Sequence, residues 1–221
     1  MSAARRMPVG VMISGRGSNL QPLLDACTRP DYPARVVLVV SNRPAAQGLA
    51  RAAAAGVPTR VIDDRDYASR ETFDAAVTEA FEAAGVELIC MAGFLRLLTE
   101  GFVERWRDRL INIHPAILPA FKGLDTHARA LATGAKLHGC TVHYVRFDMD
   151  TGPIVGQAAV PVLPDDDEAR LAARVLAAEH RLYPRCLQLI AEGRVRIAGD
   201  AAIVAGATPD AAAALINPSD S

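Results

Sequence analysis

Apolar runs of strand length alternate with helical stretches along the first half of this chain, and this alternation limits the fold more than any other feature. The clearest strand is 35–41, a run of β-branched residues that predicts burial on both faces. The clearest helix is 70–84, in which Phe73, Val77 and Phe81 recur at a spacing of four. Strands and helices in this order build a parallel sheet with helices on both faces. The same pattern predicts strands at 8–14, 58–62 and 88–91 and helices at 20–27 and 48–55.

The second half of the chain adds strands that are not separated by long helices. A strand at 110–114 is followed by a loop with Pro and Gly, and a short helix is predicted at 125–133. Two strands, 140–145 and 154–160, flank a loop too long for a tight hairpin. The remaining predicted elements are a helix at 167–192 and short strands at 195–197 and 202–204. The sequence therefore predicts an α/β fold of Rossmann-like type, with a mostly parallel twisted sheet, helices on both faces and an antiparallel addition in the C-terminal part.

Composition places further limits on the function. The 221 residues are 51% hydrophobic and 22% charged, which is typical of a globular protein with a sizeable core. The net charge of −1 gives no electrostatic footprint for nucleic acid, and no apolar run is long enough to span a membrane. Four widely spaced cysteines without a CxxC pair indicate reduced thiols. We therefore expect a cytoplasmic protein with no nucleic-acid partner and no membrane partner.

The strand at 110–114 carries two polar side chains on one face. Because side chains alternate across a strand, Asn112 and His114 share one face, and the two isoleucines share the other. An Asn amide donates hydrogen bonds, and a His ring gives or takes a proton near neutral pH. A strand end that holds these two groups indicates an active site, although two solvated polar residues at a strand end would give the same pattern.

A turn with two glycines, Gly15-Arg16-Gly17-Ser18-Asn19-Leu20, ends the first predicted strand and opens the first helix. Backbone N–H groups at such a turn, together with the helix dipole, favour a phosphate. The turn begins like a dinucleotide fingerprint, but Leu20 occupies the position of its third glycine. The second strand ends in Asn42, with no acidic residue to hold a ribose hydroxyl. A single terminal phosphate therefore suits this turn better than a dinucleotide, and a plain tight turn is the alternative.

An acidic loop, Asp148-Met149-Asp150-Thr151-Gly152-Pro153, lies between the strands 140–145 and 154–160. On its residues alone it is an acidic turn, because it lacks the ligand spacing of a calcium site. The remaining histidines fit no zinc pattern, and no serine or cysteine lies in a nucleophile motif. We therefore expect no metal and no covalent enzyme intermediate.

Taken together, these motifs resemble those of the folate-dependent formyltransferases. The resemblance rests on Asn112, His114 and Asp150 and runs from about 9 to 193. The turn with two glycines and the chain length are most similar to the branch of that family that formylates phosphoribosylglycinamide. The resemblance implies a metal-independent transfer of the formyl group from the co-substrate 10-formyltetrahydrofolate to the amine of phosphoribosylglycinamide, in purine biosynthesis.

The same resemblance implies roles for individual residues. Asn112 would donate to the oxyanion, His114 would pass a proton to the departing folate nitrogen, and Asp150 would favour the protonated ring. For the ribonucleotide it implies Gly17, Ser18 and Asn19 at the phosphate and Glu179 at the ribose hydroxyls. For the folate it implies Arg70, Leu95, Arg96, Leu97, Leu98, Asn112, Arg146, Phe147, Asp148, Met149 and Asp150. Asp125 stands where the family often has His, so the role of the turn that it forms with His127 stays open.

The domain organisation follows from the absence of repeats and linkers. We predict one domain over 1–207, with a phosphate-binding half at about 8–110 and a folate-binding, catalytic half at about 110–207. The Ala-rich tail, 208–221, is expected to be mobile. The expected partners are small-molecule substrates, and the expected state is a monomer or a weak homodimer.

Three alternatives share part of this pattern. A formyltetrahydrofolate deformylase would share Asn112, His114 and Asp150, but that family usually has an extra N-terminal regulatory domain, whereas the first strand here begins by about Pro8. A methionyl-tRNA formyltransferase would need a further C-terminal domain and a basic surface. A non-catalytic binding module for folate or nucleotide should lack part of the Asn–His–Asp set or the turn with two glycines, and both are present.

Overall fold

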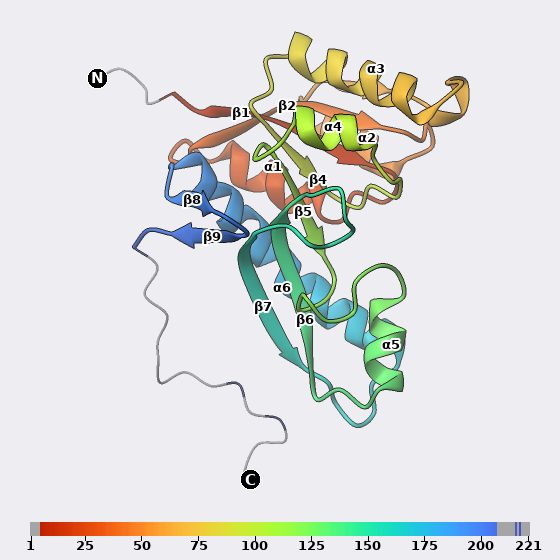
Figure 1. Ribbon diagram of the computed structural model, residues 1–221, viewed down its shortest axis with the longest axis vertical. Coiled ribbons are helices and arrows are strands. Elements are labelled where there is room, and N and C mark those ends of the chain that lie inside the picture. The colour runs from red at the N-terminus through yellow and green to blue at the C-terminus, as the bar shows by residue number, and fades with distance from the viewer. Residues whose placement is uncertain (1–4, 207–214, 216, 218–221) are drawn as a thin grey trace.

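The computed structural model describes residues 5–206, 215 and 217, and its main feature is a seven-stranded sheet with helices on both faces (Figure 1). The strand order is β3-β2-β1-β4-β5-β6-β7. The pairs from β3 to β5 are parallel. The β5–β6 and β6–β7 pairs are antiparallel. The predicted α/β fold, with a mostly parallel sheet and an antiparallel addition, is confirmed.

Apart from α4, the helices and strands lie within a few residues of the bounds that the apolar pattern predicts. The strands of the main sheet are β1 (Met7–Ile13), β2 (Ala34–Ser41), β3 (Thr59–Val61), β4 (Leu88–Met91), β5 (Leu110–His114), β6 (Leu137–Tyr144) and β7 (Ile154–Pro161). The helices are α1 (Leu20–Thr28), α2 (Gln47–Ala54), α3 (Arg70–Ala83), α4 (Glu100–Arg105), α5 (Thr126–Ala132) and α6 (Glu168–Ala191). A separate antiparallel pair, β8 (Val195–Ala198) and β9 (Ala201–Val204), follows α6.

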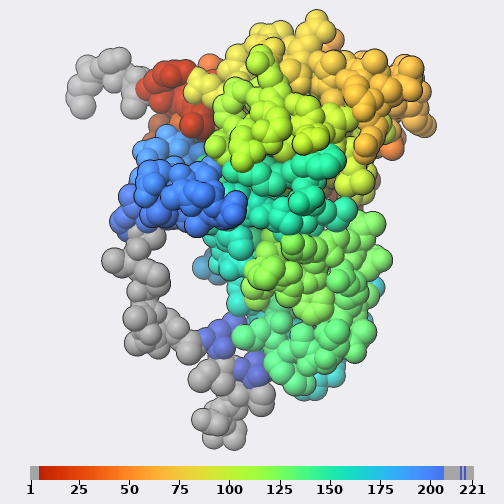
Figure 2. Space-filling model, in the orientation of Figure 1, coloured from red at the N-terminus to blue at the C-terminus, as the bar shows by residue number. Residues whose placement is uncertain are grey.

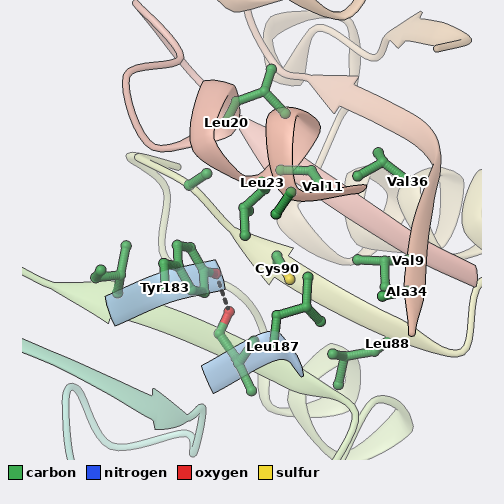
Figure 3. Close-up of a cluster of buried hydrophobic side chains, with 14 of the residues drawn as sticks. Val9, Val11, Leu20, Leu23, Ala34, Val36, Leu88, Cys90, Tyr183 and Leu187 are labelled. Atoms are coloured by element: carbon green, nitrogen blue, oxygen red, sulfur yellow. Dashed lines mark hydrogen bonds between the residues drawn. The ribbon is translucent and has the colours of Figure 1, made fainter. Parts of the chain in front are cut away.

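Alternate residues of β1 pack into two cores, one on each face of the sheet. Val9, Val11 and Ile13 belong to the core that also contains residues of α1 and α6 (Figure 3). Met12 belongs to the opposite core, together with Phe81 of α3 and residues of α4. Full burial of a large apolar side chain stabilises the fold by roughly 1.5–3 kcal/mol. Both faces of the central strands are therefore covered, which explains their nearly continuous apolar sequence.

The apolar pattern does not predict α4 or the short 3₁₀ helix Asp64–Asp66. Only Phe102 and Val103 of α4 are buried, and six residues are too few for a helical period to stand out. The start of α4 is fixed instead by Thr99, whose hydroxyl accepts a hydrogen bond from the N–H of Phe102 at 3.2 Å. These two elements lie outside the sheet and leave its topology as predicted.

The carboxyl ends of β1, β4 and β5 lie at the same edge of the sheet, because these strands are parallel. In such sheets this edge is where ligands bind. The hydroxyl of Tyr183, on α6 (labelled in Figure 3), donates to the carbonyl oxygens of Met91 and Ile111, at 2.9 and 3.3 Å. This contact ties α6 to the last residue of β4 and to the second residue of β5.

Three further observations concern the tail, membrane-spanning helices and the cysteines. The predicted mobile tail, 208–221, lies outside the described residues except for Leu215 and Asn217. Within the described residues, no helix is long and apolar enough to cross a membrane. All four cysteines fall within the described part, and none forms a disulfide there.

Candidate active site

Asn112 and His114 lie two residues apart on β5 and therefore share one face of the sheet. On one side, Met91 of β4 pairs with Asn112. On the other side, β6 places His143 opposite Asn112 and Thr141 opposite His114. The His114 residue is only 5% exposed. The two polar groups thus lie at an enclosed strand end between two neighbouring strands.

The carboxylate of Asp150 lies between two histidine rings. Its Oδ2 is 3.4 Å from Nδ1 of His114, and its Oδ1 is 3.7 Å from Nε2 of His143. The backbone N–H of Gly123 donates to Oδ2 at 2.9 Å. Nε2 of His114 lies 3.0 Å from the carbonyl oxygen of Phe121, which can only accept, so Nε2 carries a proton. A second proton on this ring would face the Asp150 carboxylate.

His143 holds the side-chain amide of Asn112. Its Nδ1 donates to the carbonyl oxygen of Tyr144 at 3.0 Å, and its Nε2 lies 3.4 Å from Nδ2 of Asn112. Burial lowers the pKa of His143, which keeps the ring neutral and makes Nε2 an acceptor. One N–H of Asn112 therefore points at His143, and the other is available to a ligand. The spacing of the histidines in the sequence does not predict this contact. The alternation of Thr141 and His143 along a strand that pairs with β5 could have predicted it, because it places both side chains on one face.

The structure brings Asn19 and Glu179 together, although they are 160 residues apart in the chain. Nδ2 of Asn19, at the start of α1, donates to Oε2 of Glu179 at 2.8 Å. Glu179 lies on α6 and is 5% exposed, and burial raises the pKa of its carboxyl to about 7. Oδ1 of Asn19 is buried and has no hydrogen-bond partner within the described residues. A buried acid and an unpaired amide oxygen at one place are typical of a site for a polar ligand.

The turn with two glycines is closely packed against the start of α2. Gly17 has a left-handed φ of 69°, and a Cβ there would lie 2.6 Å from the Cα of Gly48. The N–H of Gly48 donates to the carbonyl oxygen of Gly15 at 3.1 Å. The side chain of Asn19, the cap of α1, makes no hydrogen bond to the backbone of the helix. The first backbone N–H groups of α1 are thus not capped by a side chain, and they lie next to the Asn19–Glu179 contact.

Segments on both sides of β5 expose large apolar side chains. Leu95 and Leu97, which follow β4, are 77% and 60% exposed, and Phe147 and Met149, which follow β6, are 55% and 50% exposed. Leu98 differs, because it is buried in the core that contains α3 and α4 residues. Leu95 and Leu97 lie at the carboxyl end of β5, because β4 and β5 are parallel, and the loop that carries Phe147 and Met149 reaches this end through the contact of Asp150 with His114. Exposed apolar groups that gather in this way are typical of a ligand surface.

The arginines among the predicted folate-binding residues have different surroundings. Nη1 of Arg96 donates to the carboxylate of Asp64. Nη2 of Arg146 donates to Oδ1 of Asp108 at 2.7 Å. Arg70, the first residue of α3, is exposed. The charges of Arg96 and Arg146 are therefore balanced within the protein, whereas that of Arg70 lies at the surface.

A second pair of histidines lies near His114. The rings of His127 and His138 meet edge to face, with centroids 5.2 Å apart. Burial lowers the pKa of His138 to about 4 and also lowers that of His127, so both rings are neutral at neutral pH. Asp125, one residue before α5, has a left-handed φ of 54°. Among the residues that the structure describes, no group of three His, Cys, Asp or Glu side chains is placed to hold a metal.

Residues 7–187 match the formyl transferase family. The chain belongs to this family. The phosphoribosylglycinamide formyltransferase of Escherichia coli (strain K12) is similar in length. It is 40% identical over 200 residues, which cover 90% of this chain and 94% of the relative. The trifunctional purine biosynthetic protein adenosine-3 of Drosophila melanogaster is 50% identical over 199 residues, but the match spans only 15% of that longer relative.

Solved structures lead to the same family. The glycinamide ribonucleotide transformylase 1 from Symbiobacterium toebii superposes with a TM-score of 0.88 and 47% identity, covering 90% of this chain and 94% of that one. A formyltetrahydrofolate deformylase from Burkholderia mallei superposes with a TM-score of 0.83 and 31% identity, and the match covers 72% of that chain. The fold is therefore common to a transferase and a hydrolase, and the transferase is more similar in both sequence and extent.

Proposed function

We propose that this protein is an enzyme that transfers the formyl group of 10-formyltetrahydrofolate to the amine of phosphoribosylglycinamide, a step of purine biosynthesis. The observation that carries the proposal is the meeting of Asn112, His114 and Asp150 at one strand end. The similarity to phosphoribosylglycinamide formyltransferases over 90% of the chain supports the choice of acceptor. The four cysteines, none of them in a disulfide, support a reducing, cytoplasmic setting.

The ribonucleotide lies along the amino-terminal end of α1. The backbone N–H groups of Gly17, Ser18 and Asn19 bind its phosphate, aided by the dipole of a helix without acidic residues in its first turn. Glu179 accepts hydrogen bonds from the ribose hydroxyls, and its contact with Asn19 joins the two parts of this site. This assignment explains why a carboxyl group is kept at a position where burial opposes its charge.

The folate lies over the end of β5, between the segment that follows β4 and the loop that follows β6. The exposed side chains of Leu95, Leu97, Phe147 and Met149 offer apolar surface to its rings. The exposed guanidinium of Arg70 suits a carboxylate of the folate tail. Among the other predicted residues, Arg96 and Leu98 shape the segment from within, and the loop from Arg146 to Asp150 lies along the ring system.

The reaction is a direct acyl transfer. The amine attacks the formyl carbon, a carbon–nitrogen bond forms, and the formyl oxygen becomes an oxyanion that accepts from the N–H of Asn112 not used by His143. Such a donor contributes roughly 3–4 kcal/mol in comparable sites. The bond from carbon to N10 then breaks, so the amine loses one proton and N10 gains one. Protonated His114 supplies that proton, and Asp150 stabilises its charge and holds a water that returns the proton from the amine.

The proposed unit is one domain over 1–207. Its phosphate-binding half, about 8–110, holds the turn with two glycines, and its folate-binding half, about 110–207, holds the catalytic strand end. The contact between Asn19 and Glu179 joins the two halves, which supports a single domain. The predicted oligomeric state, a monomer or a weak homodimer, stays a prediction.

An acceptor-dependence assay tests the proposal. Release of tetrahydrofolate from 10-formyltetrahydrofolate should require phosphoribosylglycinamide and follow its concentration to saturation. The motivation is the site beside Asn19 and Glu179, for which a hydrolase has no use. Folate release at the same rate without the ribonucleotide would instead assign the chain to the deformylases. No release under either condition, with both compounds still bound, would favour the non-catalytic binding module.

Gly17→Ala should raise the KM for the ribonucleotide by about tenfold or more and leave the KM for the folate nearly unchanged. The new Cβ would lie 2.6 Å from the Cα of Gly48, at a residue with a left-handed backbone conformation. The free energy of unfolding should therefore fall by roughly 1–3 kcal/mol, and the melting temperature by several degrees. Gly15→Ala is the matched control for stability, because a Cβ at Gly15 meets nothing within 4 Å. Equal rises in both KM values would argue against a phosphate at this turn.

Glu179→Gln should separate binding from stability. Because burial raises the pKa of Glu179 to about 7, the folded protein keeps a proton that the unfolded chain loses near pH 4.5. This group therefore lowers stability as the pH rises from about 4.5 to 7, and the variant should be more stable than the wild type by about 1–3 kcal/mol at pH 8. The gain should vanish at pH 4. The KM for the ribonucleotide should rise about tenfold, since the amide offers one acceptor fewer.

Denaturation curves of both proteins at pH 4, 6 and 8 measure this difference directly. A stability difference that does not change with pH would contradict the buried ionisable carboxyl. An unchanged KM for the ribonucleotide would remove Glu179 from the binding site. The two results are independent of each other.

Exhaustive chelation should leave the activity unchanged. The proposed chemistry uses hydrogen bonds and proton transfer by Asn112, His114 and Asp150 and does not need a Lewis acid. Turnover measured after dialysis against EDTA checks this. A loss that one divalent ion restores would show that the reaction depends on a metal.

A further inference from the structure

The loop that carries Asp150 leaves the sheet beside the start of β5, whereas His114, which Asp150 contacts, lies at the other end of that strand. The N–H of Val145, just after β6, donates to the carbonyl oxygen of Leu110 at 2.9 Å, so the chain leaves β6 beside the start of β5. His114 lies at the other end of β5, four residues or about 13 Å away. Asp150 nevertheless lies 3.4 Å from His114. The loop must therefore fold back across the face of the sheet and be held there.

Arg146, at the start of this loop, contacts both of its ends. A Cβ on Gly152 would lie 3.2 Å from Cγ of Arg146 and 1.7 Å from the carbonyl oxygen of Tyr144, so the two ends of the loop are in close contact. The guanidinium of Arg146 donates to Oδ1 of Asp108 at 2.7 Å, and its side chain is only 15% exposed. Figure 2 shows the teal surface of this part of the chain directly below the yellow-green surface of the α4 region, which Asp108 follows.

Few polar contacts tie the middle of the loop to the rest of the described residues. Phe147 and Met149 are half exposed, and the hydroxyl of Thr151 bonds within the loop, to the carbonyl oxygen of Asp148. Apart from its contacts with the two histidines, the carboxylate of Asp150 accepts one hydrogen bond among the described residues, from the N–H of Gly123. The ion pair of Arg146 is therefore one of the few polar contacts between this loop and the rest of the described residues.

Asp108 itself has an unfavourable backbone conformation. Its φ of 60° lies in the left-handed region, which glycine adopts freely and which is less favoured for an aspartate. Its side chain is 47% exposed and forms an ion pair with Arg146. A residue that holds this less favoured conformation and gives its carboxylate to the loop of Asp150 points to a use for that carboxylate.

We propose that Asp108 and Arg146 form a clamp that holds the loop 146–152 across the sheet, so that Asp150 faces His114 and His143. Asp108 is then a positioning residue, since it acts on the reaction only through the loop. This inference rests on the proposed function, because it takes Asp150 as part of the reacting site. It concerns two side chains that are 38 residues apart in the chain and meet beside that site.

Asp108→Gly is the sharpest test, because it removes the carboxylate and relaxes the backbone in one change. Its melting temperature should equal or exceed that of the wild type. Its kcat should nevertheless fall about tenfold, and its KM for the folate should rise about fivefold, with the KM for the ribonucleotide unchanged. Arg146→Met keeps the apolar stem against Gly152 but removes the guanidinium, and it should give the same loss. The double variant should be no worse than either single one, since both break one contact.

Hydrogen exchange gives a readout that does not depend on activity. The amides of 147–151 should exchange about tenfold faster in Asp108→Gly than in the wild type. Glu104→Gln is the matched control, because it breaks the exposed ion pair with Arg107 in the segment just before Asp108 and should change neither exchange nor kcat. Wild-type kcat, KM and exchange in Asp108→Gly, or additive losses in the double variant, would overturn the clamp. If the wild type itself fails to transfer formyl groups, the proposed function fails, and hydrogen exchange still tests the clamp.

Discussion

Asn112→Ala should lower kcat by about 10²–10³-fold with little change in either KM or in the melting temperature. In the proposed mechanism its second amide N–H donates to the oxyanion, while the first is held by His143. A donor that acts only in the transition state affects turnover and not ground-state binding. Steady-state rates with both substrates saturating, beside a thermal melt, measure the effect.

Asn112→Asp is the matched variant for this prediction. It keeps the size of the side chain but replaces the N–H donor with a carboxylate that would repel an oxyanion, so it should be at least as inactive. His114→Ala should also lose activity by orders of magnitude, because the proton donor is removed. Near-wild-type turnover in the Asn112 or His114 alanine variant would remove that residue from the catalytic set.

Asp150→Asn should lower turnover by about 10–100-fold while both substrates still bind. The change keeps an oxygen to accept from the N–H of Gly123 and suits the left-handed φ of 54°, since Asn tolerates that region as well as Asp. It removes the negative charge that faces Nδ1 of His114 at 3.4 Å. Because this charge faces the ring that is proposed to carry the proton, its loss should lower kcat much more than it raises either KM.

Turnover at saturating substrates, both KM values and a thermal melt, for the wild type and the variant, check this mechanism. A purely structural Asp150 would behave differently, since the variant would then melt lower or bind folate poorly. Full turnover in the variant would remove Asp150 from the mechanism altogether.

The fold was predictable because most of its elements are long and regularly patterned. The β-branched run of β2 and the stripe of Phe73, Val77 and Phe81 on α3 each bury apolar groups with the period of their element. The helix α4 escaped prediction because its position depends on the side chain of Thr99 and on the packing of two residues. Short elements of this kind are fixed by tertiary contacts and not by periodicity.

The candidate site was only partly predictable, for a different reason. Asn112 and His114 could be placed on one face because strand alternation is a local property. The contact of Asn19 with Glu179 and the position of His143 depend on segments that are far apart in the chain, and no local pattern specifies them. Leu98 shows the limit most clearly, since it shares an apolar segment with exposed Leu95 and yet lies in the core.

The fate of the formyl carbon tests the central claim most directly. With a ¹³C-labelled formyl group on 10-formyltetrahydrofolate and one equivalent of phosphoribosylglycinamide, NMR spectra of a single turnover should show the label in the amide of the ribonucleotide. The amount should equal the tetrahydrofolate released, because in the proposed mechanism the amine attacks the formyl carbon directly at Asn112 and His114. Label that appears as formate, with the ribonucleotide amine unchanged, would contradict the account and identify a hydrolase.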